Sequence, residues 1–255
     1  MTLDLDLDIA PAVRVHADAD ALGRAAASDA ATRLRAALDT QPTARLMLAA
    51  APSQEATLRW LIREPGIDWA RVDAFHMDDY IGLPASAPQG FGNWLVSRFV
   101  EPLDGAPTFH RIDTTNDPQD EARRYGDTMG HDPFDLVLLG LGVNGHLAFN
   151  DPPADFHGAD GARVVPLDVV SRQQQVDEGH FPDLAAVPAQ AITVTIPRLL
   201  DARHLVASVP GGAKRQAVRD SLRQSIGGRH PGTALRTHPS VVLHVDEASH
   251  PSADR

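Results

Sequence analysis

The stretch DLVLLGLGVNGHLAFNDPP, residues 135–153, decides the fold. After one aspartate its first part, 135–142, is a continuous run of apolar residues and glycines. Such a run is typical of a central strand in a parallel sheet, because helices cover both faces of the strand. Gly142 and Gly145, with Gly140 before them, let the backbone turn sharply and approach a ligand closely. We therefore expect a buried strand that ends beside a ligand.

Apolar runs and amphipathic segments alternate along the remainder of the chain. Further strands are predicted at 45–50, 71–77, 191–196, 204–210 and 240–245, and helices at 18–38, 51–64, 90–103, 121–129, 197–202 and 213–222. Ser53 is placed to cap the second of these helices. Strands that alternate with helices indicate a parallel sheet covered on both faces. The length of 255 residues favours one α/β domain over residues 1–255.

Two polar segments, 104–120 and 151–190, interrupt this alternation. We expect them to be loop-rich insertions over one end of the sheet, where they could form a lid. Ligands of parallel α/β sheets bind beyond the carboxyl ends of the strands. The residues that follow the predicted strands are therefore the candidates for a functional site.

The composition excludes several classes of function. Acidic residues number 34 against 23 basic ones, with no Lys/Arg cluster, so nucleic-acid binding is not expected. The chain has no apolar run of 18 residues, and its first residues carry aspartates where a signal peptide would be basic, so we expect a cytoplasmic protein without a membrane segment. Cysteine is absent, which removes disulfides and thiolate chemistry. An anionic substrate remains open, because a few basic side chains and backbone N–H groups can outweigh a distant negative surface.

His146 follows the glycine-rich turn after the strand at 135–142. Asn144 lies two residues before it and Asp151 five residues after it, so an amide and a carboxylate could orient the imidazole or stabilise its charge. A histidine taken alone is more often a hydrogen-bonded structural residue than a catalytic one. These neighbours favour general acid or base chemistry instead.

Asp78 and Asp79 are adjacent carboxylates at the end of the predicted strand 71–77. Two neighbouring anions repel each other, so water, hydrogen-bond donors or a ligand must compensate them. They could be a solvated helix cap, but an aspartate and a histidine at two strand ends of one sheet indicate proton transfer. The twelve histidines are scattered without an HxH or HxxxH pair near a carboxylate cluster, so no metal site is predicted.

Four blocks, in order along the chain, resemble the glucosamine-6-phosphate deaminase (isomerase) family, which shares its fold with the 6-phosphogluconolactonases. The blocks are FHMDDYIGLP at 75–84, DLVLLGLGVNGHLAFNDPP at 135–153, VPAQAITVTIPRLLDARHLVASVPGGAKRQAV at 187–218 and ALRTHPSVVLHVDEAS at 234–249. The resemblance implies a three-layer α/β/α sandwich with a mostly parallel, Rossmann-like sheet and no cofactor. It also implies the conversion of an amino-sugar phosphate to a keto-sugar phosphate with release of ammonia.

The resemblance gives roles to particular side chains. Asp78 matches the family's carboxylate that moves a proton between C2 and C1 of the open-chain sugar. Asp79, beside it at the mouth of the pocket, would raise its proton affinity. His146 matches the histidine that opens the pyranose ring, and Lys214 in GGAKR matches a phosphate-binding lysine at the start of a helix.

Three positions depart from the family's pattern. Asn144 stands where the family usually has Asp, so it can orient His146 but cannot stabilise an imidazolium by charge. Asp151 replaces a glutamate, and its carboxylate reaches about one methylene less far, roughly 1.5 Å. The first phosphate loop, Gly- and Thr-rich in the family, reads AAAPSQ here, which leaves Ser53, Gln54 and the following helix N-terminus as donors.

Arg172, in SRQQQ, falls where the family has an arginine-containing segment over the substrate. It could bind a phosphate or a sugar, or it could be a surface arginine on a helix. His238 also lies in a family-like block, and we expect it to be a packing residue.

Three functions are weighed from the sequence. The first is deamination and isomerisation of a hexosamine 6-phosphate, such as glucosamine 6-phosphate, which explains the most residues. The second is a sugar-phosphate-binding homologue with an altered substrate or without catalysis. The third is a 6-phosphogluconolactonase-type hydrolase, whose members usually carry an arginine soon after the acidic pair, where this chain has Tyr80. The partner expected in each case is a small phosphorylated sugar, and a homo-oligomer is left open.

Overall fold

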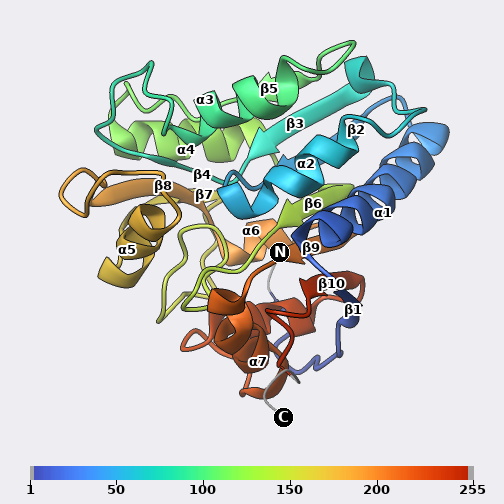
Figure 1. Cartoon of the computed structure of the whole chain (residues 1–255). Coiled ribbons are helices and arrows are strands. Elements are labelled where there is room, and N and C mark those ends of the chain that lie inside the picture. Colours follow the sequence, from blue (N-terminus) through green and yellow to red (C-terminus); the bar gives the residue numbers. More distant parts are fainter. Residues whose placement is uncertain (1–2, 252–255) are drawn as a thin grey trace.

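A computed structural model, which describes residues 3–251, has a seven-stranded sheet at its centre (Figure 1). The strands lie in the order β1 (Ala12–His16), β10 (Val241–Asp246), β9 (Leu205–Val209), β6 (Leu136–Leu139), β2 (Ala44–Leu48), β3 (Val72–His76) and β5 (Thr108–His110). Every neighbouring pair is parallel. The predicted α/β class with a mostly parallel sheet is thereby confirmed. The two edge strands, β1 and β5, escaped prediction because they are short and partly exposed.

Helices cover both faces of this sheet. On one face lie α1 (Ala19–Thr40), α2 (Glu55–Leu61) and α3 (Phe91–Leu95), which continues into the π-helical turn η3 (Val96–Val100); on the other lie α4 (Pro118–Met129), α6 (Ile196–Leu200) and α7 (Arg215–Arg223). Each face of the sheet packs its own hydrophobic core, and successive side chains of β6 point to opposite faces. Leu136 and Leu138 pack in the core beside α1, and Val137 and Leu139 pack in the core beside α4. The continuous apolar run at the centre of the sequence thus belongs to a strand that is buried on both sides.

A second, three-stranded sheet stands beyond the carboxyl ends of the main strands. It consists of β4 (Asp78–Tyr80), β8 (Gln190–Val194) and β7 (Ala162–Pro166), paired antiparallel with β8 in the middle. Met77 joins the two sheets, because its N–H donates to Leu48 O of the main sheet at 3.2 Å and its carbonyl accepts from Val194 N at 2.8 Å. The predicted strand at 191–196 is therefore real but lies outside the parallel sheet.

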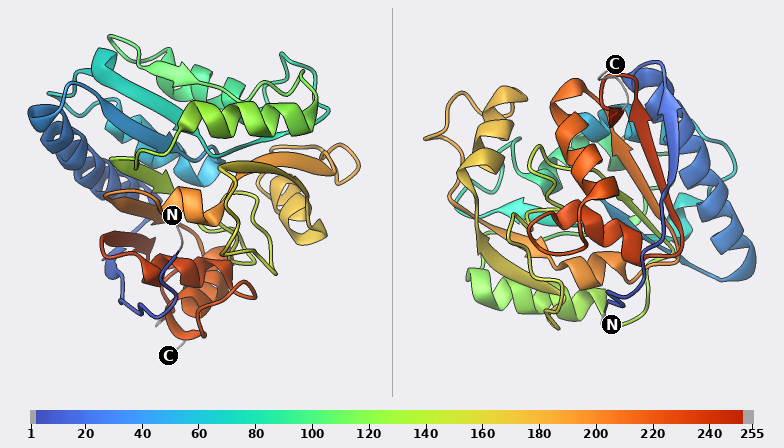
Figure 2. Two further views of the ribbon diagram at one scale, coloured as in Figure 1. Left: turned by 180° about the vertical axis from the view of Figure 1, so that it is seen from behind. Right: turned by 90° about the horizontal axis from the view of Figure 1, so that it is seen from below.

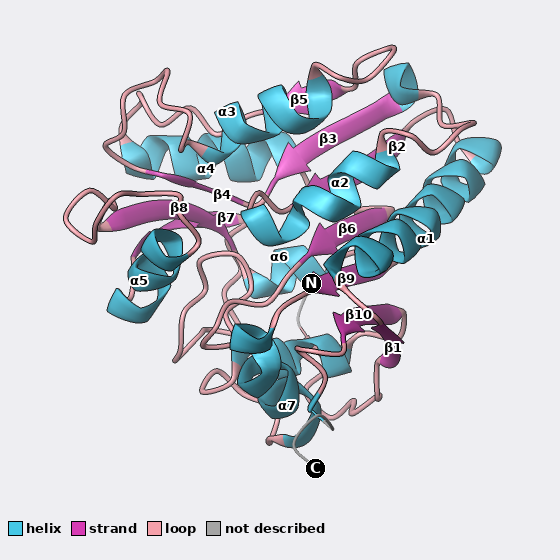
Figure 3. Ribbon diagram, viewed as in Figure 1, coloured by secondary structure: helices cyan, strands magenta, loops and turns pink. Residues whose placement is uncertain are grey.

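The segment 151–190 contains more regular structure than its polar composition indicates. Besides β7 it includes α5 (Val169–Asp177), whose N-cap Asp168 accepts a hydrogen bond from Val170 N at 2.7 Å. α5 lies at the periphery beside β7 and β8 in every view (Figure 2). The long loop between β6 and β7 runs past the same end of the main sheet (Figure 3). For 151–190 the expectation of an insertion over one end of the sheet agrees with this arrangement, although α5 is a helix rather than a loop. For 104–120 the expectation is wrong, because this segment contains β5 of the main sheet and the start of α4.

Short turns complete the chain: η1 (Pro52–Gln54), η2 (Trp69–Arg71), η4 (Gly212–Lys214) and η5 (Pro231–Thr237). The first of them corrects the predicted cap of α2. Ser53 lies inside the 3-10 turn η1, and the N-cap of α2 is Gln54, with no hydrogen bond from the cap side chain. Within residues 3–251, no helix is long and apolar enough to cross a membrane.

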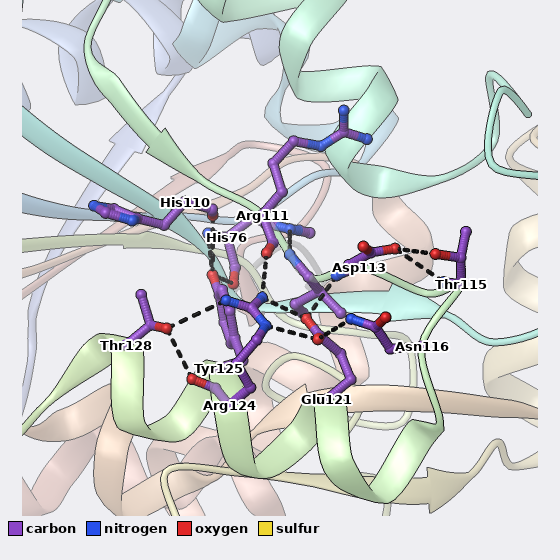
Figure 4. Close-up of polar contacts among 11 residues, drawn as sticks. His76, His110, Arg111, Asp113, Thr115, Asn116, Glu121, Arg124, Tyr125 and Thr128 are labelled. Atoms are coloured by element: carbon purple, nitrogen blue, oxygen red, sulfur yellow. Dashed lines mark hydrogen bonds and ion pairs between the residues drawn. The ribbon is translucent and has the colours of Figure 1, made fainter.

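A buried polar cluster supports the chain that leaves β3 (Figure 4). Tyr125 Oη on α4 donates to His76 O at 2.7 Å and accepts from His76 N at 2.9 Å. On the same helix Glu121 accepts from Asp113 N at 2.6 Å and from Arg124 Nε at 2.7 Å. Burial acts to raise the pKa of Glu121, but the hydrogen bonds from Arg124 and from the backbone of Asp113 hold it below its usual value. Tyr125 therefore attaches the end of β3 to α4, and Glu121 attaches the loop after β5 to the same helix.

Candidate active site

A narrow cavity of about 50 Å³ lies where the chain leaves β2, β3 and β6. Asp78 and His146 line it, together with Ser53, Gln54 and Gly142. These residues come from three loops that are far apart in the sequence and follow three neighbouring strands. The carboxyl ends of parallel strands meet at one edge of a sheet, and the structure places the predicted acid–base pair there.

The imidazole of His146 is held at its Nδ1 atom. Nδ1 lies 3.1 Å from Asp151 Oδ1 and 2.8 Å from Ser171 Oγ. An ionised carboxylate can only accept, so we assign the shared proton to Nδ1, and Nε2 is then the acceptor of the neutral ring. His146 is thus oriented as a base.

Asp151 accepts several hydrogen bonds at once. Oδ1 accepts from Asn144 Nδ2 at 2.9 Å and from Ser171 Oγ, and Oδ2 accepts from Asp168 N at 3.0 Å. Burial acts to raise the pKa of Asp151, but the hydrogen bond from His146 and the charge that this ring carries when protonated, aided by Asn144 and Ser171, lower it to about 2. The shorter aspartate therefore reaches the imidazole and is ionised at neutral pH.

Asn144 forms hydrogen bonds with both His146 and Asp151. Its Oδ1 accepts from His146 N at 3.1 Å while its Nδ2 donates to Asp151. The amide therefore positions the backbone of His146 and the carboxylate of Asp151, and of these two neighbours of His146 only Asp151 can carry a negative charge.

Two glycines set the position of the imidazole. A Cβ at Gly142 would lie 2.2 Å from His146 Cε1, closer than any real contact, so only glycine lets the ring pack here. Gly145 has φ +84°, in the left-handed region, and its N–H donates to Gly142 O at 3.0 Å. Gly142 lines the cavity, whereas Gly145 belongs to the turn and does not line the cavity.

Asp78 is buried, and burial is the main cause that raises its pKa well above the usual value; the charge of Asp79 adds to the effect. His76 holds its backbone: His76 Nε2 accepts from Ile112 N at 3.0 Å, so Nδ1 carries the proton and donates to Asp78 O at 2.9 Å. A buried carboxyl with high proton affinity, fixed by the chain behind it, is suited to abstract a proton from carbon.

Asp79 has a different task from its neighbour. Its Oδ1 accepts from Tyr80 N at 2.8 Å and Phe91 N at 2.9 Å, and its Oδ2 accepts from Gly92 N at 2.9 Å. These three N–H groups compensate its charge, which explains how two adjacent carboxylates can be buried together. Asp79 does not line the cavity. Through these hydrogen bonds Asp79 attaches β4 to the start of α3.

In the loop after β2, Gln54 is buried and its Nε2 donates to Ser208 O at 3.0 Å and to Ser53 Oγ at 3.3 Å. The amide thereby joins the ends of β2 and β9. Both side chains border the cavity.

Arg172 and Lys214, the two basic residues predicted to bind the substrate, are not among the residues that line the cavity. Arg172 donates from one guanidinium nitrogen to Leu184 O at 2.7 Å and Val187 O at 2.8 Å, and so holds the segment between α5 and β8. Arg172 is half-buried, and its guanidinium contacts these backbone carbonyls rather than the cavity. Lys214 is buried, with its Nζ 3.2 Å from Glu178 Oε1.

Sequence reasoning missed the buried face of α5. Ser171 contacts His146, and Gln174 and Gln175 line the cavity. Together with Glu178 these residues are spaced at 171, 174, 175 and 178, which is one face of a helix. A helical stripe of polar residues in a segment over the site is a signal that could have identified them.

The fold and the site define an α/β enzyme whose acid and base groups follow the carboxyl ends of parallel strands. The family of glucosamine-6-phosphate isomerases/6-phosphogluconolactonase matches residues 17–243, and the chain belongs to this family.

Relatives agree with this assignment. Glucosamine-6-phosphate deaminase 1 of Bacillus subtilis (strain 168) is 32% identical over 228 residues, covering 86% of this chain and 92% of the relative. Glucosamine-6-phosphate deaminase of Hahella chejuensis (strain KCTC 2396) is 32% identical over 217 residues, covering 82% of this chain and 80% of the relative.

Solved structures show the same architecture. A monomeric glucosamine-6-phosphate deaminase superposes with a TM-score of 0.85 at 28% identity, over 96% of this chain and 100% of that one. A 6-phosphogluconolactonase from Shewanella baltica OS155 has a TM-score of 0.77 at 17% identity, over 94% of this chain and 99% of that one. The second likeness concerns the fold alone.

Proposed function

We propose that this protein converts glucosamine 6-phosphate to fructose 6-phosphate and ammonia. The names of its relatives support this function. The observation that carries the proposal is the placement of two proton-transfer groups, Asp78 and the His146–Asp151 pair, at one cavity. Isomerisation of a cyclic amino sugar requires one group for an oxygen-bound proton and another for a carbon-bound proton.

His146 opens the ring in this proposal. Its Nε2 takes the proton of the anomeric hydroxyl, and the same proton is returned to the ring oxygen as the C1–O5 bond breaks. The imidazolium that forms between these steps is stabilised by the charge of Asp151, 3.1 Å away. Because the pKa of Asp151 is about 2, this charge is present throughout the neutral range.

Asp78 then isomerises the open chain. As a carboxylate it removes the proton at C2, the electrons form a double bond between C1 and C2, and the C1 oxygen takes a proton from the substrate's own ammonium group, which gives an amino enol. Return of the proton to C1 leaves an imine at C2. Water adds to this carbon and ammonia leaves, which gives the ketose. The raised pKa of Asp78 favours the abstraction, because a more basic carboxylate is a better acceptor for a carbon-bound proton.

The direct test is ammonia release from glucosamine 6-phosphate by the purified protein. We expect Asp78→Asn and His146→Ala each to lower kcat by roughly 10²-fold or more. His157→Ala is the matched control, because His157 is an exposed histidine after the same β6 strand, and it should retain activity. Absence of ammonia from the wild type, alongside hydrolysis of 6-phosphogluconolactone, would reject the proposal.

A further inference from the structure

We propose that Glu178 is a specificity-determining residue that competes with the phosphate of the substrate for Lys214. On this view the C-terminal end of α5 is displaced when substrate binds, and Glu178 sets the affinity for the anionic end. The inference rests on the proposed function, since it assigns the phosphate of that substrate to Lys214.

The ion pair is buried and incompletely satisfied. Lys214 Nζ lies 3.2 Å from Glu178 Oε1, and side-chain exposures are 6% and 19%. An ammonium has three donors. Beyond this ion pair, Nζ has no hydrogen-bond partner among residues 3–251, and neither has Glu178 Oε2. A phosphate offers several acceptor oxygens and more charge, so it can satisfy Lys214 better than one carboxylate oxygen does.

Gln174 links this ion pair to the cavity. Its side chain lines the cavity, its Oε1 accepts from Val143 N at 2.9 Å, and its Nε2 donates to Glu178 Oε1 at 2.8 Å. Glu178 and Gln174 therefore stand between the catalytic groups and Lys214. In this proposal a sugar whose C1 and C2 are at His146 and Asp78 contacts Lys214 after these two side chains move.

The size of the cavity leads to the same conclusion. Sites for small molecules usually occupy roughly 300–1,000 Å³, whereas this cavity has about 50 Å³. The contacts under α5 also leave Gln175 Oε1 and Tyr80 Oη buried without a hydrogen-bond partner in the described part of the chain. Each such group disfavours the closed arrangement. Movement of α5 would open the cavity and release these groups to water or substrate.

The test compares Glu178→Gln with Asp177→Asn. Both remove one negative charge from the end of α5, but Asp177 is exposed and accepts only from Gln173 Nε2, at 2.8 Å, in the contacts described for its side chain. Inorganic phosphate is titrated into each protein by calorimetry at fixed ionic strength, and KM and kcat for glucosamine 6-phosphate are measured in parallel.

We expect Glu178→Gln to bind phosphate roughly tenfold more tightly, because one charge-assisted competitor is lost. Its KM should fall by a similar factor with little change in kcat, and Asp177→Asn should stay within about twofold of the wild type. In a Lys214→Gln background the gain should disappear. Thermal unfolding checks that each variant is folded, and Glu178→Asp, with a retracted carboxylate, gives an intermediate gain.

Unchanged or weaker phosphate binding by folded Glu178→Gln would overturn the inference, as would a gain that survives Lys214→Gln. The two proposals fail separately. If the wild type releases no ammonia but Glu178→Gln binds phosphate more tightly, the function is wrong and the competition stands. If ammonia is released and phosphate binding is unaffected, the competition is wrong and the function stands.

Discussion

The charge of Asp151 should make a measurable contribution to stability as well as to catalysis. Its pKa is about 2 in the folded protein against 3.8 ordinarily, and a tenfold change in proton affinity equals about 1.4 kcal/mol. The ionised side chain therefore contributes roughly 2 kcal/mol to the free energy of unfolding. Since the folded pKa is the lower one, this contribution is complete above about pH 4 and disappears as the pH falls towards 2.

Urea unfolding of the wild type and Asp151→Asn at pH 7, 5 and 3 tests this reasoning. We expect the variant to be less stable by about 2 kcal/mol at pH 7, and the difference to fall to about half at pH 3. Asp160→Asn is the control, because Asp160 is an exposed carboxylate between β6 and β7. A variant as stable as the wild type at pH 7, or a difference that does not change with pH, would refute the assignment.

Two further substitutions examine the surroundings of the catalytic groups. Gly142→Ala should destabilise the protein by about 1–3 kcal/mol and lower kcat, because the new Cβ would displace the His146 ring. Gly227→Ala is the control, because its added Cβ meets nothing within 4 Å. Equal unfolding midpoints for the two variants would contradict the predicted destabilisation. Asp79→Asn should move the acid limb of the kcat/KM profile to lower pH, since the charge of Asp79 helps to raise the pKa of Asp78. A limb that stays in place or moves to higher pH would show that this coupling is unimportant.

The sequence alone determined the five inner strands of the main sheet and the centre of the site, because both depend on local patterns. The continuous apolar run before Gly140 could only be a strand buried on both faces, and the structure confirms it as β6. Asn144, His146 and Asp151 lie close together in the sequence, at the start of the loop between β6 and β7, so their mutual contacts follow from proximity in the chain.

Tertiary structure decided the features that depend on distant pairing. The small antiparallel sheet arises because β4 pairs with β8, more than a hundred residues later, and it gives Asp78 and Asp79 separate tasks. The polar stripe of α5 can be found in the sequence, but its spacing does not say that Ser171 contacts His146 or that Glu178 pairs with Lys214. Those contacts exist because α5 packs over the strand ends, and whether a polar side chain there meets water, an ion or another residue is set by the packing of the whole chain.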